Sequence, residues 1–261
     1  MAQKPPVSLP LLPLSLHPTR STAVWAVGRF LFAYDLQLGT WQVRRRELHG
    51  EAIRALHAYT LAAGKTVWLS AGDDKMVMTW TEEGGDWELQ HSFSNPKKIT
   101  AALFDKDGRV VFGDRFGDVL RWVPGEGDAQ LLSSHFAMVT AMAFTPSGSY
   151  LVVGDNHEKV RVSRYPETAD IRSFCFGHTS QITAVSTLCL DGQERLLSAS
   201  ADATLRLWTL DGEECKSWKL PAAVSSLSFG AGSAALGIET LGTGLGRVSL
   251  TSNEVEMLLP E

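Results

Sequence analysis

The sequence predicts an all-β fold made of six similar units of antiparallel strands, which is the architecture of a WD40 β-propeller. Short alternating apolar runs, separated by Gly and Asp, occur along the whole chain, and no helical period of useful length competes with them. The apolar residue that begins a unit recurs at gaps of 46, 40, 43 and 42 residues, at Ile53, Ile99, Val139, Ile182 and Val224. This period agrees with the ~40–45 residues of one WD blade.

Length and composition place all of these units in one globular domain. The chain has 261 residues, of which 44% are hydrophobic, and 23 are Gly, so it is long enough to bury a large core. We expect residues 1–20 to be an N-terminal leader or a divergent first strand, and residues 21–261 to form the propeller. Two prolines interrupt the apolar leader, so a signal peptide is not expected.

Charge and cysteine content exclude several classes of protein. The net charge of −5 is wrong for a chain that binds nucleic acid by its overall field, so such a role would need a local basic patch. The three Cys are odd in number and lack metal-site spacing, which favours a reducing intracellular compartment. No apolar run approaches ~20 residues, so no membrane span and no membrane partner are expected.

The fifth unit carries the most complete pattern. His178 lies four residues before Ile182, and Ser198 and Asp202 lie ten and six residues before Trp208. In WD repeats this set forms hydrogen bonds from the Trp indole to Ser, from Ser to His and from His to Asp, which satisfies polar groups that the blade buries. A Ser-His-Asp hydrolase triad is the competing interpretation; the spacing is that of a blade and no oxyanion loop accompanies it.

The second unit repeats the same set at the same offsets. It comprises His49, Ser70, Asp74 and Trp80. Two independent complete sets make a chance pattern a poor explanation, so we expect both to be structural and not catalytic.

The first and sixth units are less regular. The first, about residues 21–46, shows three strand-like runs and ends in the basic run Arg44–Arg46. We expect this run to be a solvated strand end, with a contact to acidic protein or RNA as the alternative. The sixth, about residues 223–259, keeps apolar alternation but has no His, Asp or Trp of the set.

The third unit, about residues 96–133, keeps Trp122 and loses the rest of the set. Phe112 and Phe116 stand where Ser and Asp are expected. Basic residues enter the unit and occupy its turn: Lys97, Lys98 and Arg115.

The fourth unit, about residues 134–174, keeps His135 and has Val153, His157 and Ser163 at the other three positions. It gains three cations, Lys159, Arg161 and Arg164, and alternation puts Lys159 and Arg161 on one face of their strand. The two units that lost their polar set are therefore the two that gained charge. This favours a partner-binding face there, and ordinary solvated strands in degenerate units are the alternative.

The motifs of units three to five resemble one family of WD proteins. The strings EKVRVS followed by SFCFGH, the turn GDRFGDV and the entry KKIT occur here in the order found in the WD-repeat non-catalytic subunit of the tRNA (guanine-N7-)-methyltransferase complex. The resemblance covers about residues 97–208.

The resemblance implies a role without chemistry of its own. In that family a seven-bladed propeller binds and stabilises a methyltransferase subunit, forming a heterodimer that makes N7-methylguanosine in the variable loop of tRNA. The partner holds S-adenosylmethionine, so this chain would need no cofactor and no metal, and tRNA would be reached through the complex. The family implies the nucleus as the location, with the cytoplasm as a further one.

Carried over position by position, the resemblance assigns partner-binding residues. Arg161 matches the basic residue that pairs with a carboxylate of the methyltransferase. The other matches are Glu158, Lys159, Arg164, Arg115, Lys97 and Lys98, whereas His157 departs from the acidic residue expected at its position.

Two other functions stay open from the residues alone. A WD scaffold for another intracellular complex requires only the repeats. An enzyme would require a nucleotide loop, a metal cluster or an uncommitted triad, and the sequence shows none of these patterns.

Overall fold

The computed structural model describes residues 14–16, 22–61, 64–83, 86–229, 235–240, 244–249 and 255–257. Within these ranges the chain forms strands and turns and no helix, which confirms the predicted all-β class. The strands of the described residues belong to six sheets, and each sheet has four strands that pair antiparallel with their neighbours in the chain. The sheets are the blades of a propeller.

The first three sheets follow the predicted units. The first contains β1 (Leu14–Leu16), β2 (Thr22–Val27), β3 (Phe30–Asp35) and β4 (Thr40–Glu47). The second contains β5 (Ile53–Thr60), β6 (Thr66–Gly72), β7 (Met76–Glu83) and β8 (Asp86–Ser94). The third contains β9 (Ile99–Phe104), β10 (Val110–Asp114), β11 (Asp118–Trp122) and β12 (Gln130–Ser134).

The last three sheets repeat the arrangement. The fourth contains β13 (Val139–Phe144), β14 (Tyr150–Asp155), β15 (Val160–Arg164) and β16 (Ile171–Cys175). The fifth contains β17 (Ile182–Leu190), β18 (Gln193–Ser200), β19 (Thr204–Thr209) and β20 (Glu214–Lys219). The sixth contains β21 (Val224–Phe229), β22 (Ala235–Thr240), β23 (Gly244–Ser249) and β24 (Val255–Met257).

The first sheet has one strand more than the three runs found in its unit. The extra strand, β1, comes from the N-terminal segment 1–20, and Leu14 pairs with Trp25 of β2. A divergent first strand was one of the two expectations for this segment, and a strand of three residues is too short for alternation to give its position. Residues 1–13 and 17–20, for which a leader was the other expectation, lie outside the described residues.

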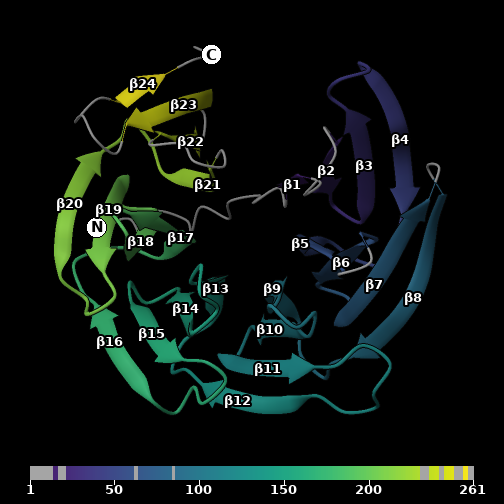
Figure 1. Cartoon of the computed structure of the whole chain (residues 1–261), viewed down its shortest axis with the longest axis horizontal. Helices are drawn as coiled ribbons and strands as arrows, with labels where there is room; N and C mark the ends of the chain where they lie inside the picture. The colour runs from purple at the N-terminus through teal and green to yellow at the C-terminus, as the bar shows by residue number, and fades with distance from the viewer. Residues whose placement is uncertain are drawn as a thin grey trace, which may run out of the picture.

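The six sheets are arranged around a common centre, with the first strand of each sheet innermost (Figure 1). Successive innermost strands pack against one another from β1 through β5, β9, β13 and β17 to β21. Among the described residues, no comparable packing joins the sixth sheet to the first, and Figure 1 shows the widest interval of the ring between them.

The core lies between neighbouring sheets. Trp208 of the fifth sheet is 1% exposed and packs against Val160 and Val162 of the fourth sheet. Burying a large apolar side chain in this way contributes about 1.5–3 kcal/mol. Since alternate residues of a strand face opposite ways, Arg161 and Ser163 point to the other side of β15, toward the third sheet.

Candidate partner-binding face

The fifth sheet contains the hydrogen-bonded network that its spacing predicts. The indole N–H of Trp208 donates to Ser198 Oγ at 2.8 Å, His178 Nε2 lies 2.8 Å from the same oxygen, and His178 Nδ1 lies 3.0 Å from Asp202 Oδ2. Burial lowers the pKa of His178. The imidazole is therefore neutral, so its Nδ1–H donates to the carboxylate and its Nε2 accepts the Ser198 proton.

The second sheet contains the same network. Trp80 donates to Ser70 Oγ at 2.8 Å, His49 Nε2 lies 2.8 Å from that oxygen, and His49 Nδ1 lies 2.9 Å from Asp74 Oδ2. Ser70 and Ser198 are fully buried and committed to the indole and the imidazole. Neither serine is placed to attack a substrate, so these sets hold the sheets together.

The third and fourth sheets satisfy the equivalent turn in a different way. In sheets two and five, the turn aspartate accepts the backbone N–H two residues later, that of Met76 or of Thr204. In sheets three and four the carboxylate stands two residues earlier in the chain. Asp114 accepts the N–H of Asp118, and Asp155 accepts the N–H of Lys159, at 3.1 and 3.0 Å.

This shift frees the position that holds the turn aspartate in the complete sheets. In the third sheet that position is Phe116 and in the fourth it is His157, and both side chains are exposed. The buried carboxylates of Asp114 and Asp155 also accept the N–H groups of these two residues, at 2.8 Å each. The N–H groups of the turn thus donate to a buried carboxylate, and the side chain at the tip of the turn faces outward.

Lys97 and Lys98 are already paired with carboxylates of this chain. Lys97 Nζ lies 2.6 Å from Asp118 Oδ2 and 3.7 Å from Asp114 Oδ2, and the hydrogen bond to Asp118 raises the pKa of Lys97. Lys98 Nζ lies 2.7 Å from Glu51 Oε2. Both lysines therefore tie turns at this end of the second and third sheets, and little of their charge is left uncompensated.

Arg115, Glu158 and Lys159 lie at the same end of the sheets and are exposed. The side chains of these three residues make no ion pair with any other residue in the described part of the chain. Glu158 has a φ of 74°, the left-handed conformation that Lys75 and Ala203 adopt at the same turn position of sheets two and five. These three predicted residues are thus free for an outside partner.

Arg161 is not exposed beside them. It is 9% exposed, its Nε donates to Ser163 Oγ at 2.9 Å, and its Nη2 donates to the carbonyl of Thr168 at 2.5 Å. Burial lowers the pKa of Arg161. Within the described residues no carboxylate pairs with this guanidinium.

The equivalent residue of the fifth sheet shows what Arg161 lacks. Arg206 also stands two residues before the Trp position, and its Nη1 donates to Glu214 of the neighbouring strand β20. It lies over the ring of Trp208, 5.9 Å from the centroid. In the fourth sheet, Ser163 stands at the position of Trp208, and the side chain of Arg161 lies in the interior. The signal in the sequence was the pairing of a small residue at the Trp position with an Arg two residues before it.

His135 is the other member of the incomplete set in the fourth sheet. Val153 stands where the complete sheets have serine, so His135 Nε2 is buried without a hydrogen-bond partner in the described part of the chain. Burial first, and then the charge of Arg161, lower the pKa of His135 to about 4. A neutral imidazole thus lies beside a buried guanidinium.

Two other groups of predicted contacts are engaged locally. Arg164 Nε lies 2.9 Å from Asp170 Oδ2, and both side chains are exposed, so this ion pair is weak and can rearrange. In the basic run of the first sheet, the Arg45 guanidinium lies 3.9 Å from the ring centroid of Phe30. The Arg44 side chain lies outside the described residues.

Sequence reasoning missed three exposed phenylalanines at the same end of the sheets. Phe116, Phe136 and Phe176 are 67%, 107% and 66% exposed. A signal was present, because each Phe stands in a turn or connection and not in a strand. Phe136 follows His135, and Phe176 lies two residues before His178.

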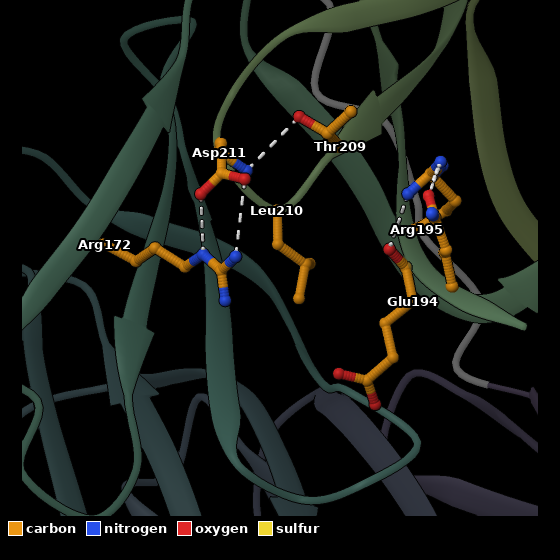
Figure 2. A pocket seen from close by; sticks show the side chains of 7 residues that line it. Arg172, Glu194, Arg195, Thr209, Leu210 and Asp211 are labelled. Carbon is orange, nitrogen blue, oxygen red and sulfur yellow. Dashed lines mark hydrogen bonds and ion pairs between the residues drawn. The ribbon is translucent and has the colours of Figure 1, made fainter.

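A pocket of about 390 Å³ lies at the opposite end of the fourth and fifth sheets. Figure 2 shows the Arg172 guanidinium directed at the Asp211 carboxylate, with Nε 2.9 Å from Oδ1. This contact lowers the pKa of Asp211. Arg195 is held by Gln193 Oε1 and by the carbonyl of Glu194. Because both arginines are internally paired, we assign no ligand to this pocket.

Across the described ranges, no group of three or more His, Cys, Asp or Glu is placed to hold a metal ion. None of the same residues forms a helix that is long and apolar enough to cross a membrane.

The comparisons with known proteins agree with the resemblance drawn from the motifs. Residues 125–239 match the family model described as the tRNA methyltransferase TRM82 WD40 domain. This range includes Glu158, Lys159, Arg161 and Arg164, whereas Lys97, Lys98 and Arg115 lie before it. It also extends past Trp208, the expected end of the resemblance.

Curated relatives carry the same description. The chain is 30% identical over 168 residues to the tRNA (guanine-N(7)-)-methyltransferase non-catalytic subunit wdr4 of Dictyostelium discoideum, covering 56% of this chain and 36% of that protein. It is 41% identical over 116 residues to the non-catalytic subunit of Caenorhabditis elegans, covering 44% and 29%. It is 34% identical over 157 residues to the non-catalytic subunit wuho of Drosophila melanogaster, covering 59% of this chain and 36% of that protein. The chain thus spans about a third of the length of these relatives.

A solved structure confirms the fold. The β-propeller domain of Cps50 (Swd1), described under Myceliophteria_thermophila, superposes with a TM-score of 0.77 over 95% of this chain and 86% of that one. At 14% identity the likeness concerns the fold alone.

Proposed function

We propose that this chain is a non-catalytic WD-repeat subunit that binds and stabilises a tRNA (guanine-N7) methyltransferase. The similarity to proteins named as such subunits supports this, and the residues that match the family model, 125–239, include the whole of the fourth and fifth sheets. The relatives are about three times longer than the matched part, so the activity of the whole relatives is carried over here as a proposal.

One observation in the structure carries the proposal: the guanidinium of Arg161 is buried and has only neutral acceptors in the described chain, Ser163 Oγ and the Thr168 carbonyl. A buried charge without a counter-ion is costly, and a charge that is paired across an interface is stabilised. A carboxylate of the methyltransferase that approaches the 9% of Arg161 still exposed would supply the missing partner.

The surroundings of Arg161 fit such an approach. Lys159 and Glu158 lie two and three residues before it, exposed and without ion pairs to other described residues. They would set the orientation of the partner through opposite charges. Arg115, across the interface between the third and fourth sheets, would add a second cation.

The chemistry belongs to the partner in this proposal. The methyltransferase would bind S-adenosylmethionine and the guanine, and this chain would contribute its surface and no cofactor. Because the net charge is −5, most of the positive charge that tRNA requires would also come from the partner. We propose the nucleus as the main location, with the cytoplasm as a further one.

Reconstitution tests this function. The methyltransferase subunit encoded by the same genome and this chain are produced separately, and methyl transfer from S-adenosylmethionine to tRNA is measured for each alone and for the mixture. We expect co-elution as a heterodimer, and a rate that rises at least tenfold when this chain is added. Methylation by this chain alone would refute the non-catalytic role, and failure to co-elute would leave a scaffold for another complex as the better function.

A further inference from the structure

Three exposed phenylalanines form a row along one end of the third, fourth and fifth sheets. This phenylalanine rim consists of Phe116, Phe136 and Phe176, with exposed fractions of 67%, 107% and 66%. Phe116 lies in the β10–β11 turn, Phe136 in the connection from β12 to β13, and Phe176 in the connection from β16 to β17.

Backbone hydrogen bonds join the segments that carry the rim. The N–H of His135 donates to the Gly117 carbonyl at 2.8 Å, which joins the turn of Phe116 to the connection of Phe136. The N–H of Asn156 donates to the Met138 carbonyl at 3.1 Å, which joins that connection to the turn of Lys159.

The pairing of β15 with β16, the last two strands of the fourth sheet, extends the rim toward the fifth sheet. Val160 of β15 pairs with Cys175 of β16, which sets Lys159 and Phe176 beside each other where the two strands meet the turn. Phe176 also stacks on Phe174, with 5.7 Å between ring centroids and 21° between planes.

Exposure of this kind is unusual for phenylalanine. A single exposed apolar side chain needs no explanation, but three exposed rings on hydrogen-bonded segments at one end of the sheets indicate a binding surface. Aromatic anchors also dominate the energetics of interfaces between proteins, since they bury a large area and lose few rotamers.

The charges along the rim indicate the chemistry of the occupant. Arg115 and Lys159 are exposed cations with no ion pair in the described chain, whereas Lys97 and Lys98 are compensated by Asp118 and Glu51. Two free cations are few for an RNA backbone, whose binding grows with the number of phosphates neutralised. They suit an apolar protein surface bordered by carboxylates.

We propose that the phenylalanine rim is the apolar anchor for the methyltransferase subunit, and that Phe136 at its centre contributes most to affinity. The inference rests on the proposed function, and it says which side chains supply the free energy of binding to the methyltransferase. Binding depends mainly on rings that enter an apolar patch of the partner, while Arg115 and Lys159 steer the approach and add salt dependence.

Equilibrium binding of the full chain to the separately produced methyltransferase subunit tests the rim. We expect Phe136→Ser to raise Kd 10- to 100-fold and Phe176→Ser to raise it at least threefold, at every salt concentration. Lys159→Gln should change Kd by a few fold, through a slower association rate and a weaker dependence on salt.

A matched control separates this effect from the general loss of an exposed apolar side chain. Leu38, in the turn between β3 and β4, is 72% exposed and far from the rim in the chain order of the sheets. Leu38→Ser should leave Kd unchanged, and thermal unfolding should show that all of these variants keep the wild-type Tm.

The outcomes distinguish the two proposals. If the wild-type chain does not bind the methyltransferase, the proposed function fails, and the inference fails with it. If the wild-type chain binds and Phe136→Ser binds equally well, only the anchor role is refuted. Weaker binding of tRNA, with unchanged binding of the methyltransferase, would assign the rim to RNA and overturn the inference.

Discussion

The guanidinium of Arg161 donates to the hydroxyl of Ser163 at 2.9 Å, on the face of the fourth sheet where the fifth sheet carries the indole of Trp208. A side chain that alternation places on an accessible strand face is thereby held inside, between the third and fourth sheets. The Thr168 carbonyl holds its other end, and the Thr168 hydroxyl donates to the Leu132 carbonyl of the third sheet at 2.7 Å.

Replacing Arg161 by Met should separate binding from folding. Met keeps length and apolar contact and removes a charge that has no counter-ion, so we expect the free energy of unfolding to change by less than about 1.5 kcal/mol. Affinity for the methyltransferase should fall at least tenfold, measured by titration calorimetry. Arg206→Met, at the equivalent position of the fifth sheet, is the control and should bind normally; equal affinity of the two variants would show that Arg161 is only structural.

Charge reversal at Arg161 is the weaker test. A glutamate there would bury a carboxylate without a cation to pair with it, and would place it against the Thr168 carbonyl, which can only accept hydrogen bonds. Such a variant should unfold more readily, so a loss of binding would be uninformative.

The His-Ser-Trp network should carry measurable stability. Ser198→Ala removes the acceptor of the Trp208 indole and the donor to His178, and both groups are buried. We expect urea unfolding to show a loss of about 2–4 kcal/mol. Ser92→Ala, on the exposed outer strand β8, should cost less than about 0.5 kcal/mol. A similar small cost for Ser198→Ala would mean that the network is not structural.

Stability should fall as the pH is lowered from neutrality. Burial lowers the pKa of His57 and of His135 from 6.5 to about 4. Between these values the unfolded chain binds protons that the folded chain does not, so the stabilisation present above pH 6.5 is lost as the pH falls toward 4. Each histidine contributes a slope of about 1.4 kcal/mol per pH unit.

A variant at His57 checks this origin of the pH dependence. His57 Nδ1 accepts the backbone N–H of Phe104 at 3.3 Å, and an asparagine can accept the same bond without titrating. His57→Asn should therefore reduce the slope of unfolding free energy against pH by about 1.4 kcal/mol per unit. An unchanged slope would show that other groups cause the acid sensitivity.

The displaced turn carboxylate of the fourth sheet predicts a rescue. Asp155→Ala should cost about 2–3 kcal/mol, because the N–H groups of His157 and Lys159 lose their acceptor. Adding His157→Asp restores the arrangement of the complete sheets, in which the aspartate accepts the N–H two residues later. Thermal unfolding of the double variant should recover about half of the loss. No recovery would mean that the two positions are not interchangeable.

Much of the architecture was predictable from the sequence, because the offsets of the polar set reflect strand geometry. Five strands begin at the residues predicted to begin a unit, and both complete networks form as spaced: the five residues are Ile53, Ile99, Val139, Ile182 and Val224. The position of Arg161 was not predictable in the same way. Alternation assigns Arg161 to a face of β15, but only the packing of sheets decides whether a neighbour covers that face.

The predicted contacts differ in how free they are. Lys97 and Lys98 looked available because their partners Asp118 and Glu51 lie 21 and 47 residues away in the chain. Such pairs depend on the closing of turns from different units, and no local pattern reports them. Conversely, the exposure of Phe136 goes against the ordinary expectation that Phe is buried.

The two-residue displacement of the turn carboxylate has a consequence for how this surface can change. In sheets two and five the tip of the turn is fixed, since replacing Asp74 or Asp202 breaks the network inside the sheet. In sheets three and four, the buried carboxylates of Asp114 and Asp155 accept the N–H groups of the turn instead. The side chains of Phe116 and His157 are therefore not needed to satisfy the turn. Mutations can accumulate at these two tips, and recognition can diverge between lineages, while the sheets beneath them keep their stability.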